Sequence, residues 1–510
     1  MISLILSLFT LLISITPLTA KPISPFFDID PDVVYVTNAM SYIKRHQIAY
    51  TDHPGTPYII TLAASYTPLR LYAKYIKHTP FIEWSLENFS FLVLYSRFFA
   101  AILFSSGIYL YLHTIKKYTK SNLLTLMSWL LIFSYSGLFR FSVRLTPENF
   151  LPIIFALWFS CLVSLLKKQT TKKIVLLNLI SGIAFATKFT NLSFPLISGL
   201  ITLNFFMSKN KKKFSRLFFN LSFIFIGFLV STWVVKSQYP RLLSWTSSMA
   251  THSGIHGSGS KTLFDLSVYQ ESIKKLIESE SLASKLFFFT PLVFLISLFK
   301  IKRNKRTFFA LILLPTLAIA LVFSKYSLFY YQLPHLFILS SLLVLILHQL
   351  IFVNKEHSSL KLALSILVII LSLPMPKNIS NHLKLSQGVK KLAVFEQYLK
   401  DHPPKYKTLW QYGNSKDFSI IWGRSWSGEF YGEELTKLYP HLGEMINFKY
   451  YRSNKPEIFP LFDTCWDQLY LQTPLLPRLL ENFPGGDLEI IELDYKDLIL
   501  VTSSHCDTIN

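Results

Sequence analysis

The feature that most constrains the fold of this chain is a series of apolar runs, each of roughly 17–20 residues, that recur along its first 375 residues. A helix needs about 20 such residues to cross the hydrocarbon core of a bilayer. Only 16% of the residues are charged, which is low for a soluble domain. The sequence therefore predicts a polytopic α-helical membrane protein with about eleven transmembrane helices. The expected spans are 2–19, 89–115, 123–139, 150–166, 174–187, 192–207, 217–235, 286–299, 307–323, 336–353 and 361–373.

The formal net charge of +22, taken alone, is compatible with binding to a nucleic acid. The excess lies in short loops between the apolar runs, whereas from Pro376 onward acidic residues slightly outnumber basic ones. Loops rich in lysine and arginine stay in the cytoplasm. The charge pattern therefore predicts a multi-pass protein of the plasma membrane, in contact with membrane lipids and not with nucleic acid. It places the remaining loops and the tail outside the cytoplasm.

The polar tail, residues 376–510, is predicted to be a small soluble α/β domain on the extracytoplasmic side, following a membrane domain over residues 1–375. Helices are expected over Val389–Lys400 and Gly432–Tyr439. Four segments indicate strands, of which the last two would form a hairpin: KTLWQYG, FSIIWGR, LEIIELD and DLILVTS. Cys465 and Cys506 lie in this tail and would either pair or remain free thiols.

The first outer loop, residues 20–88, follows an apolar segment that is either a signal peptide or, as we expect from its lack of N-terminal Lys or Arg, an uncleaved transmembrane helix. The loop opens with Asp28, Asp30 and Asp32. Pro31 suits the first position of an amphipathic interfacial helix that ends near Arg45. A second interfacial helix, around 58–77, should break at Pro68.

The aspartates admit two interpretations. Asp30 fits the N-cap of the first interfacial helix, and Asp28 and Asp32 would then be solvated. Alternatively, the helix N-terminus keeps a carboxylate ionised, which suits a general base or a ligand of a divalent metal. Carboxylates beside a membrane surface are costly without such a role or a partner.

Three segments in a fixed order carry a family resemblance: DIDPDVVYVTNAMSYI with TDHPGTPYI, SGIAFATKFTNLSFP, and SKYSLFYYQLPHL before a late span. Over about the first 350 residues the chain resembles the C-type membrane glycosyltransferases (GT-C fold), and within them the superfamily of protein O-mannosyltransferases and lipid A aminoarabinose transferases. The resemblance implies a GT-C-like glycosyltransferase domain over residues 1–375. It also implies an extracytoplasmic domain after it.

The resemblance implies an inverting hexosyl- or pentosyltransferase of the cell envelope that uses a polyprenyl-phosphate sugar donor. The acceptor hydroxyl would belong to a protein, a lipid or a glycan. A first-loop aspartate would act as general base, and that role falls on Asp30, with Asp28 the competing choice. The family often has adjacent acids where this chain has Asp-Ile-Asp-Pro-Asp. No cofactor is otherwise implied, although the Asp cluster is compatible with a divalent metal.

Loss of a phosphate leaving group requires cations on the outer side. Lys188 is the first choice because it lies in an Ala-Thr-Lys stretch resembling the family's, and Arg144 and Lys325 come next. Each could instead be a snorkelling side chain at the interface. The segment THSGIHGSGS is expected to be a flap that gates substrates. The predicted substrate-binding residues are Asp32, Asp52, His53, Arg144, Lys188, His256, Lys325 and Tyr331.

Two other classes of function compete with the transferase. A transporter or flippase of lipid-linked sugars would need ionisable residues deep inside several spans, and the sequence has few there. It also has no Walker-type phosphate loop, which disfavours ATP-driven transport. A structural or assembly protein would instead use the polar tail as a binding module.

Overall fold

The computed structural model describes residues 1–19, 25–27, 29–49, 55–207, 214–252, 261, 266–351, 366–367, 370–405, 408–410, 415–440, 442–445, 468–472, 476, 488–493 and 498–503. The chain forms two compact units, each built from three segments. The first unit comprises Met1–Ile15, Tyr50–Thr61 and Phe98–Leu383. The second comprises Thr16–Ala49, Leu62–Arg97 and Lys384–Asn510.

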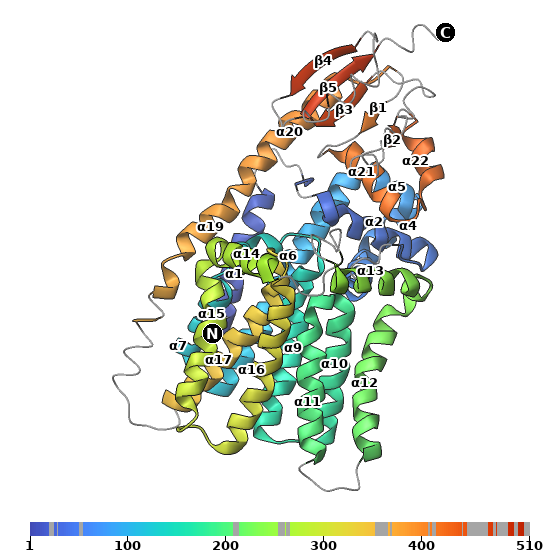
Figure 1. Ribbon diagram of the computed structural model, residues 1–510. Helices are drawn as coiled ribbons and strands as arrows, with labels where there is room; N and C mark the ends of the chain where they lie inside the picture. The colour runs from blue at the N-terminus through green and yellow to red at the C-terminus, as the bar shows by residue number, and fades with distance from the viewer. Residues whose placement is uncertain are drawn as a thin grey trace. The chain divides into compact units, whose positions relative to one another are not determined.

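The first unit is a helical bundle (Figure 1). Three helices, α1 (Ile2–Thr19), α3 (Thr56–Ser65) and α6 (Phe89–Thr119), belong partly to it and partly to the second unit. Its other α-helices are α7 (Asn122–Ile132), α8 (Leu138–Phe141), α9 (Pro147–Lys167), α10 (Thr171–Thr187), α11 (Ser193–Met207), α12 (Phe214–Thr232), α13 (Tyr239–Thr251), α14 (Leu266–Ser279), α15 (Ser281–Ser297), α16 (Arg303–Phe323), α17 (Leu333–Ile351) and α19 (Met375–Leu383). Short 3₁₀ turns are η1 (Phe189–Leu192), η2 (Trp233–Gln238) and η4 (Phe329–Gln332).

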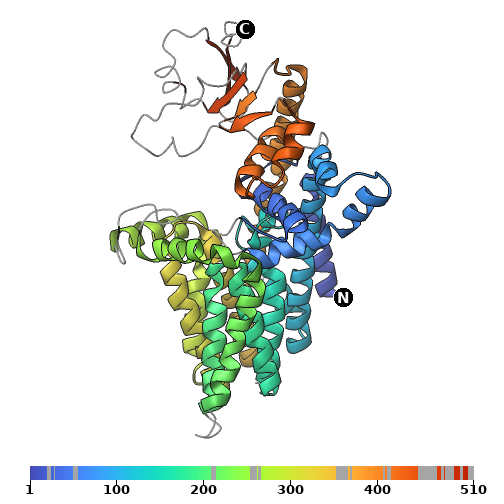
Figure 2. The same ribbon diagram turned by 90° about the vertical axis from the view of Figure 1, so that its right-hand side faces the viewer.

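Helices α9, α10, α11 and α12 run side by side, and α13 and α14 lie across one end of the bundle (Figures 1 and 2). Glycines let α10 and α12 approach closely, since a Cβ added at Gly182 would lie 2.0 Å from the Ile224 carbonyl oxygen. A Cβ at Gly227 would similarly lie 2.3 Å from the Leu179 carbonyl oxygen. Small residues serve the same purpose between helices in membranes generally.

Within the described residues, seven helices are long and apolar enough to cross a membrane, or up to eight if a bent pair around Glu280 counts as one span. The prediction of a polytopic membrane protein is confirmed, but the count of eleven is not. The span expected over 123–139 is replaced by α7, which ends at Ile132 because turns follow it. The span expected over 361–373 lies largely outside the described residues.

The two ends of the bundle differ in charge. Basic residues flank the helix ends at Lys116 and Lys117 of α6, Lys167 of α9, Lys172 and Lys173 of α10, and Arg303 of α16. The opposite ends of α9, α10 and α17 carry Glu148, Lys188 and the tyrosines of η4. The predicted substrate-binding residues Lys188 and Tyr331 thus share the end of the bundle that is opposite the lysine-rich one.

The second unit contains a five-stranded sheet in the order β2-β1-β3-β5-β4, whose strands are labelled in Figure 1. Strand β1 pairs in parallel with β2 and β3, whereas β3–β5 and β4–β5 are antiparallel. The predicted hairpin near the C-terminus is confirmed as β4–β5. The strands are β1 (Thr408–Trp410), β2 (Leu442–Met445), β3 (Gln468–Gln472), β4 (Leu488–Leu493) and β5 (Leu498–Ser503).

The strand predicted at FSIIWGR is wrong, because this segment forms the helix α21 (Lys416–Trp426). Ser415 caps it by accepting a hydrogen bond from the Phe418 amide at 3.1 Å, and Asp417 lies in the first turn. Both features favour a helix start. The expected helices of the tail are present as α20 (Leu385–Asp401) and α22 (Gly432–Leu438).

Helix α21 packs against α2 (Ile29–Arg45), the first of the predicted interfacial helices. The Thr37 hydroxyl donates to the Gly423 carbonyl oxygen at 3.1 Å, and a Cβ at Gly423 would lie 2.4 Å from Thr37 Cγ2. Helix α2 begins two residues before Pro31, so Asp30 lies inside its first turn and not at the N-cap position. The predicted break near Pro68 is confirmed, since α4 (Thr67–Tyr75) starts one residue before it.

Candidate active site

Lys188 lies where α10 ends and η1 begins. Its extended backbone (φ −162°, ψ 139°) interrupts the helix and directs the chain into the next span. The side chain is buried, and its Nζ donates a hydrogen bond to Oε1 of Glu148. Glu148 belongs to the first turn of α9 and is itself only 7% exposed. A buried cation and a buried carboxylate therefore compensate each other at the ends of two neighbouring helices.

Two tyrosine rings flank the ammonium group of Lys188. Nζ lies 4.8 Å from the ring centroid of Tyr330 and 5.1 Å from that of Tyr331, both in η4. Such cation–π contacts stabilise a charge that has left bulk water. The hydroxyl of Tyr331 has no hydrogen-bond partner among the described residues, and neither has that of buried Thr190. We refer to Glu148, Lys188, Thr190, Tyr330 and Tyr331 as the Lys188 cluster.

The charge state of Lys188 reflects opposing influences. Burial lowers the pKa of its ammonium group below the usual value, because the charged form loses hydration. The carboxylate of Glu148 raises this pKa, whereas the positive charge of Arg144 lowers it further. Glu148 therefore opposes the lowering of the Lys188 pKa by burial and by Arg144.

The loop that carries Arg144 is fixed by Asn149. The Asn149 amide donates to the carbonyl oxygens of Phe141 at 3.1 Å, Ser142 at 2.8 Å and Ala100 at 3.1 Å. The guanidinium of Arg144 lies 5.8 Å from the ring centroid of Phe141. The Arg144 backbone is thus held beside the first turn of α9, which supplies Glu148.

The start of α3 packs on the same end of the bundle. The Gly55 amide donates to the carbonyl oxygen of Thr187 at 3.1 Å, one residue before Lys188. Gly55 has a φ of +56°, a conformation that favours glycine. The ring centroids of Tyr58 and Phe150 are 6.2 Å apart, which ties α3 to the first turn of α9. The segment TPYI, which follows Gly55 in the sequence, therefore borders the Lys188 cluster.

Lys325 supports the same region from the connection between α16 and η4. Its Nζ donates to the carbonyl oxygen of Met249 in α13, and the Tyr326 hydroxyl donates to the same oxygen at 2.6 Å. The rings of Tyr326 and Tyr331 have centroids 5.7 Å apart. Burial lowers the pKa of Lys325 and raises that of Tyr326 to about 12. Lys325 thus holds α13 beside the residues that pack on the Lys188 cluster.

Asp32 lies in the second unit and has a different environment. Its Oδ2 accepts a hydrogen bond from Arg97 Nη1 at 2.7 Å, and both side chains are fully buried. Arg97 also donates from Nε to the Pro25 carbonyl oxygen at 2.8 Å and from Nη2 to that of Phe27. The pair therefore fixes the chain around Pro25–Phe27. Substrate binding by Asp32 stays a prediction.

Several predicted site residues lie outside the described residues: Asp28, Asp52, His53 and His256, together with the side chain of Asp30. The described part of the flap shows a β-bridge between His252 and Lys261. No group of three or more His, Cys, Asp or Glu side chains suited to a metal occurs among the described residues. The described acids Asp32 and Glu148 are each paired with a basic side chain, so they do not fit a metal site.

Glu148 is the site residue that sequence reasoning missed. It follows Pro147 at the start of α9, where a proline and then an acid are common in any helix. The sequence signal that could have identified Glu148 is its place in the chain. It is an acidic residue four positions after Arg144, one of the cations predicted to bind a phosphate. Only the fold shows that its partner is Lys188, 40 residues later.

Comparison with known proteins finds no matching protein family and no matching curated protein. The solved structures that match include ArnT from Cupriavidus metallidurans bound to undecaprenyl phosphate and the same protein in the apo state. Each is 11% identical with a TM-score of 0.54, and the match covers 99% of this chain and 98% of ArnT. ArnT is a lipid A aminoarabinose transferase of GT-C fold. The likeness shows that this chain has the same fold along nearly its whole length.

Proposed function

We propose that this protein transfers a sugar from a polyprenyl-phosphate donor to an acceptor hydroxyl at the outer face of the membrane, with inversion at the anomeric carbon. The single observation that supports this most is the Lys188 cluster, a buried cation with an unpartnered tyrosine hydroxyl at the end of the bundle opposite the lysine-rich loops. The positive-inside rule assigns that end to the outer face. We assign the tail, residues 376–510, to the same side.

The reaction divides into proton removal and departure of the leaving group. A first-loop carboxylate, Asp30 or Asp28, accepts the proton of the acceptor hydroxyl. The hydroxyl oxygen then attacks the anomeric carbon from the face opposite the phosphate. The bond between this carbon and the phosphate oxygen breaks, and the polyprenyl phosphate leaves with the electron pair. A base within hydrogen-bonding reach and cations at the leaving oxygen are the two requirements of this chemistry.

In this proposal Lys188 and Arg144 stabilise the negative charge that develops on the leaving phosphate. The water-excluded position of Lys188 strengthens such an interaction relative to bulk water. Glu148 positions Lys188 and keeps it protonated, and the hydroxyl of Tyr331 donates to a phosphate or sugar oxygen. Lys325 acts by holding α13. Asp52, His53 and His256 are assigned to the substrate pocket on sequence grounds, with the flap around His256 closing over it.

Two observations support the lipid-linked donor in particular. The chain shares the fold of ArnT, whose structure was solved with undecaprenyl phosphate. The cations lie at helix ends beside apolar spans, where a phosphate attached to a prenyl chain would meet them. A soluble nucleotide sugar would require no such apolar surroundings. The sugar and the acceptor are left to experiment.

The proposal is tested by reconstituting the full chain in liposomes with undecaprenyl phosphate that carries a tritiated hexose or pentose. The cell-envelope fraction supplies acceptors. We expect one donor to lose its label to that fraction, and Asp30→Asn to abolish the loss. If Asp30→Asn transfers at the wild-type rate and Asp28→Asn does not, the base is Asp28.

Two outcomes would overturn the proposal. If no donor transfers its sugar while labelled lipid moves between the leaflets, the protein is a flippase. If Asp30→Asn and Asp28→Asn both transfer normally, the first loop supplies no base. Lys384→Gln, on the second unit and outside the proposed site, serves as the matched control and should transfer at the wild-type rate.

A further inference from the structure

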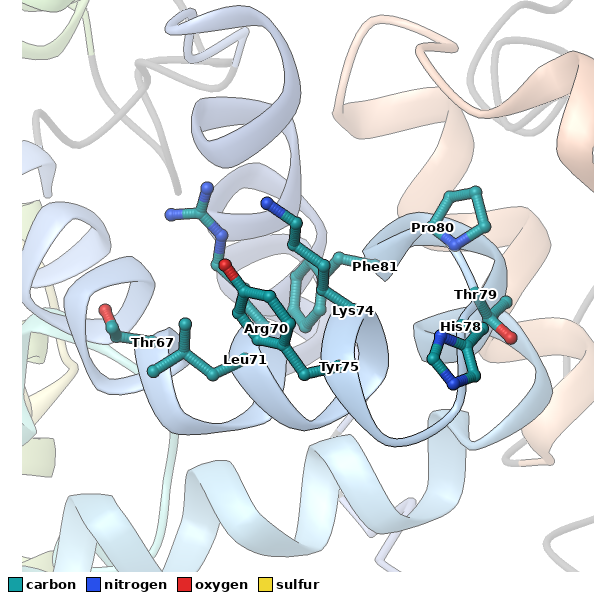
Figure 3. Close-up of a pocket in the computed structure, with 9 residues that line it drawn as sticks. All are labelled: Thr67, Arg70, Leu71, Lys74, Tyr75, His78, Thr79, Pro80 and Phe81. Carbon is teal, nitrogen blue, oxygen red and sulfur yellow. The ribbon is translucent and has the colours of Figure 1, made fainter.

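A pocket with basic residues in its lining lies in the first outer loop, between α4 and the start of α5 (Phe81–Glu87). It has a volume of about 670 Å³ and is open to solvent. Figure 3 shows that Arg70 and Lys74 extend their charged ends to the same side of α4. His78 and Thr79 lie on the connection to α5, and Thr67 and Tyr75 complete the polar lining.

The pocket is strongly cationic. Residues 67–80, TPLRLYAKYIKHTP, contain three Lys or Arg residues and one His but no acid. Among the described residues, Arg70, Lys74 and His78 take part in no ion pair, unlike Lys44, which pairs with Glu434, or Lys437, which pairs with Glu83. Cations that are one helical turn apart repel each other without an anion between them. This arrangement therefore favours an anionic ligand.

The turn after α4 holds His78 in an unusual conformation. His78 has a φ of +52°, in the left-handed region where glycine or asparagine usually ends a helix. The Thr79 amide donates to the Ala73 carbonyl oxygen at 3.1 Å, which closes the turn across six residues. This turn sets His78 and Thr79 on the wall of the pocket.

The surroundings of the pocket are typical of the level of lipid headgroups. The apolar side chains Leu71 and Ile76 are 53% and 64% exposed. The Trp84 ring makes edge contacts with Tyr72 at 6.0 Å and with Phe91 at 6.1 Å, at the start of the span α6. Belts of tryptophan and tyrosine mark the membrane–water interface. A helix of this composition lies in that interface with its cations toward the headgroups.

We propose that this pocket binds the phosphate-bearing headgroup of an anionic membrane phospholipid. The guanidinium of Arg70 offers two parallel donors to the phosphate oxygens, and Lys74 adds a second positive charge. Leu71 and the Tyr75 ring, which is 59% exposed, provide an apolar side for the first part of an acyl chain. The inference does not rest on the transfer reaction, since none of its residues belongs to the Lys188 cluster.

The test measures binding to the purified full chain in detergent by native mass spectrometry. The three probes are dioctanoylphosphatidylglycerol, dioctanoylphosphatidylcholine and inorganic phosphate alone. We expect phosphatidylglycerol to bind at least about tenfold more tightly than either of the others. Phosphatidylcholine tests whether net charge is needed, and inorganic phosphate tests whether the glycerol and acyl parts contribute.

Two variants test the pocket itself. Arg70→Gln/Lys74→Gln removes two exposed charges and should weaken phosphatidylglycerol binding by roughly thirtyfold. His78→Gly keeps the positive φ without strain, so it should weaken binding several-fold without lowering the melting temperature. The matched control is Lys274→Gln/Lys275→Gln on α14, which removes two exposed charges elsewhere and should leave binding within about twofold.

Three results would contradict the proposed lipid site, and each would have a different meaning. If inorganic phosphate binds as tightly as phosphatidylglycerol, the ligand is a soluble phosphate and the lipid assignment is wrong. If Arg70→Gln/Lys74→Gln binds phosphatidylglycerol like the wild type, the pocket is not the site. If Lys188→Gln alone loses phosphatidylglycerol binding, the lipid occupies the proposed transfer site, which overturns this inference and leaves the proposed function standing.

Discussion

Two buried ion pairs, Arg97–Asp32 and Lys188–Glu148, each join one basic and one acidic side chain. The groups that surround the basic side chain differ between the two pairs. The Arg97 side chain donates to the Asp32 carboxylate and to the carbonyl oxygens of Pro25 and Phe27. The Lys188 ammonium group donates to one side chain among the described residues, that of Glu148, and two tyrosine rings lie beside it. Arginine suits the first role because its planar fork can hold several acceptors at once, whereas lysine presents a single point of charge.

In the function that we propose, this difference separates a structural pair, Arg97–Asp32, from a functional pair, Lys188–Glu148. Beside Arg97, each of the three guanidinium nitrogens donates to a protein acceptor: Nε to the Pro25 carbonyl oxygen, Nη1 to Oδ2 of Asp32 and Nη2 to the Phe27 carbonyl oxygen. Beside Lys188, the hydroxyls of Tyr331 and Thr190 are buried without a partner among the described residues. Unsatisfied buried polar groups are costly, which is why they mark places where a ligand completes the hydrogen bonding.

The largest expected effect is on the structural pair. Arg97→Met leaves Asp32 buried without its cation and should lower the free energy of unfolding by about 3–5 kcal/mol. Chemical denaturation in detergent measures this. Arg97→Met/Asp32→Leu should recover only part of the loss, because the carbonyl groups of Pro25 and Phe27 remain unpaired. If Arg97→Met is as stable as the wild type, Arg97–Asp32 is not a structural pair and does not differ from Lys188–Glu148 in this respect.

The next effect concerns close packing within the second unit, away from any ion pair. Gly423→Ala would place a Cβ 2.4 Å from Thr37 Cγ2 and should cost about 1–3 kcal/mol of stability. Thr37→Ser removes that methyl group and keeps the hydroxyl, so it should restore part of the stability in the double variant. Equal stability of Gly423→Ala in both backgrounds would show that the methyl contact is not the cause.

A smaller effect tests the functional pair through pH. The carboxylate of Glu148 raises the pKa of Lys188, so Glu148→Gln should lower that pKa. If transfer needs cationic Lys188, kcat/KM falls as the pH rises through the pKa of Lys188, and in the variant this fall should move to lower pH. Glu148→Asp, which keeps the charge, should restore most of the wild-type profile. If the fall of kcat/KM at high pH occurs at the same pH in Glu148→Gln as in the wild type, Glu148 has a purely structural role.

The smallest expected effect is on the tyrosine hydroxyl. Tyr331→Phe removes a buried hydroxyl without a partner among the described residues, so stability should stay the same or rise by up to about 1 kcal/mol. Transfer should nevertheless slow about tenfold if the hydroxyl contacts substrate. Thermal unfolding and initial rates measure the two quantities on one preparation. If Tyr331→Phe is less stable than the wild type but transfers sugar at the same rate, Tyr331 has a structural role.

The membrane character of the chain could be predicted from its sequence, but the number of spans could not. Apolar length and the lysine-rich loops identify helices such as α9 and α16 directly. Hydropathy does not reveal that α7 ends at Ile132, where turns with serine and glycine follow. The sequence predicts a strand at FSIIWGR because its β-branched and aromatic residues favour strands. The N-cap at Ser415 instead stabilises the start of a helix there.

The candidate site could be predicted in part. Lys188 and Tyr331 were expected as substrate-binding residues, and the fold brings them into contact. Glu148 was missed because a helix-start acid has a sufficient local explanation. The partnership of Asp32 with Arg97, 65 residues apart, depends on tertiary packing that no local pattern encodes. Long-range pairs of this kind decide which charged residues remain available for chemistry.

Binding of undecaprenyl phosphate to purified wild-type protein and to Lys188→Gln tests the central claim most directly. Glutamine removes the charge and keeps an N–H donor on a side chain that is one bond shorter. Loss of a charge-assisted phosphate contact should weaken binding by about ten- to a hundredfold, while stability falls less than in Arg97→Met. Equal affinities of the wild type and Lys188→Gln for undecaprenyl phosphate would contradict the assignment of the Lys188 cluster as the phosphate site.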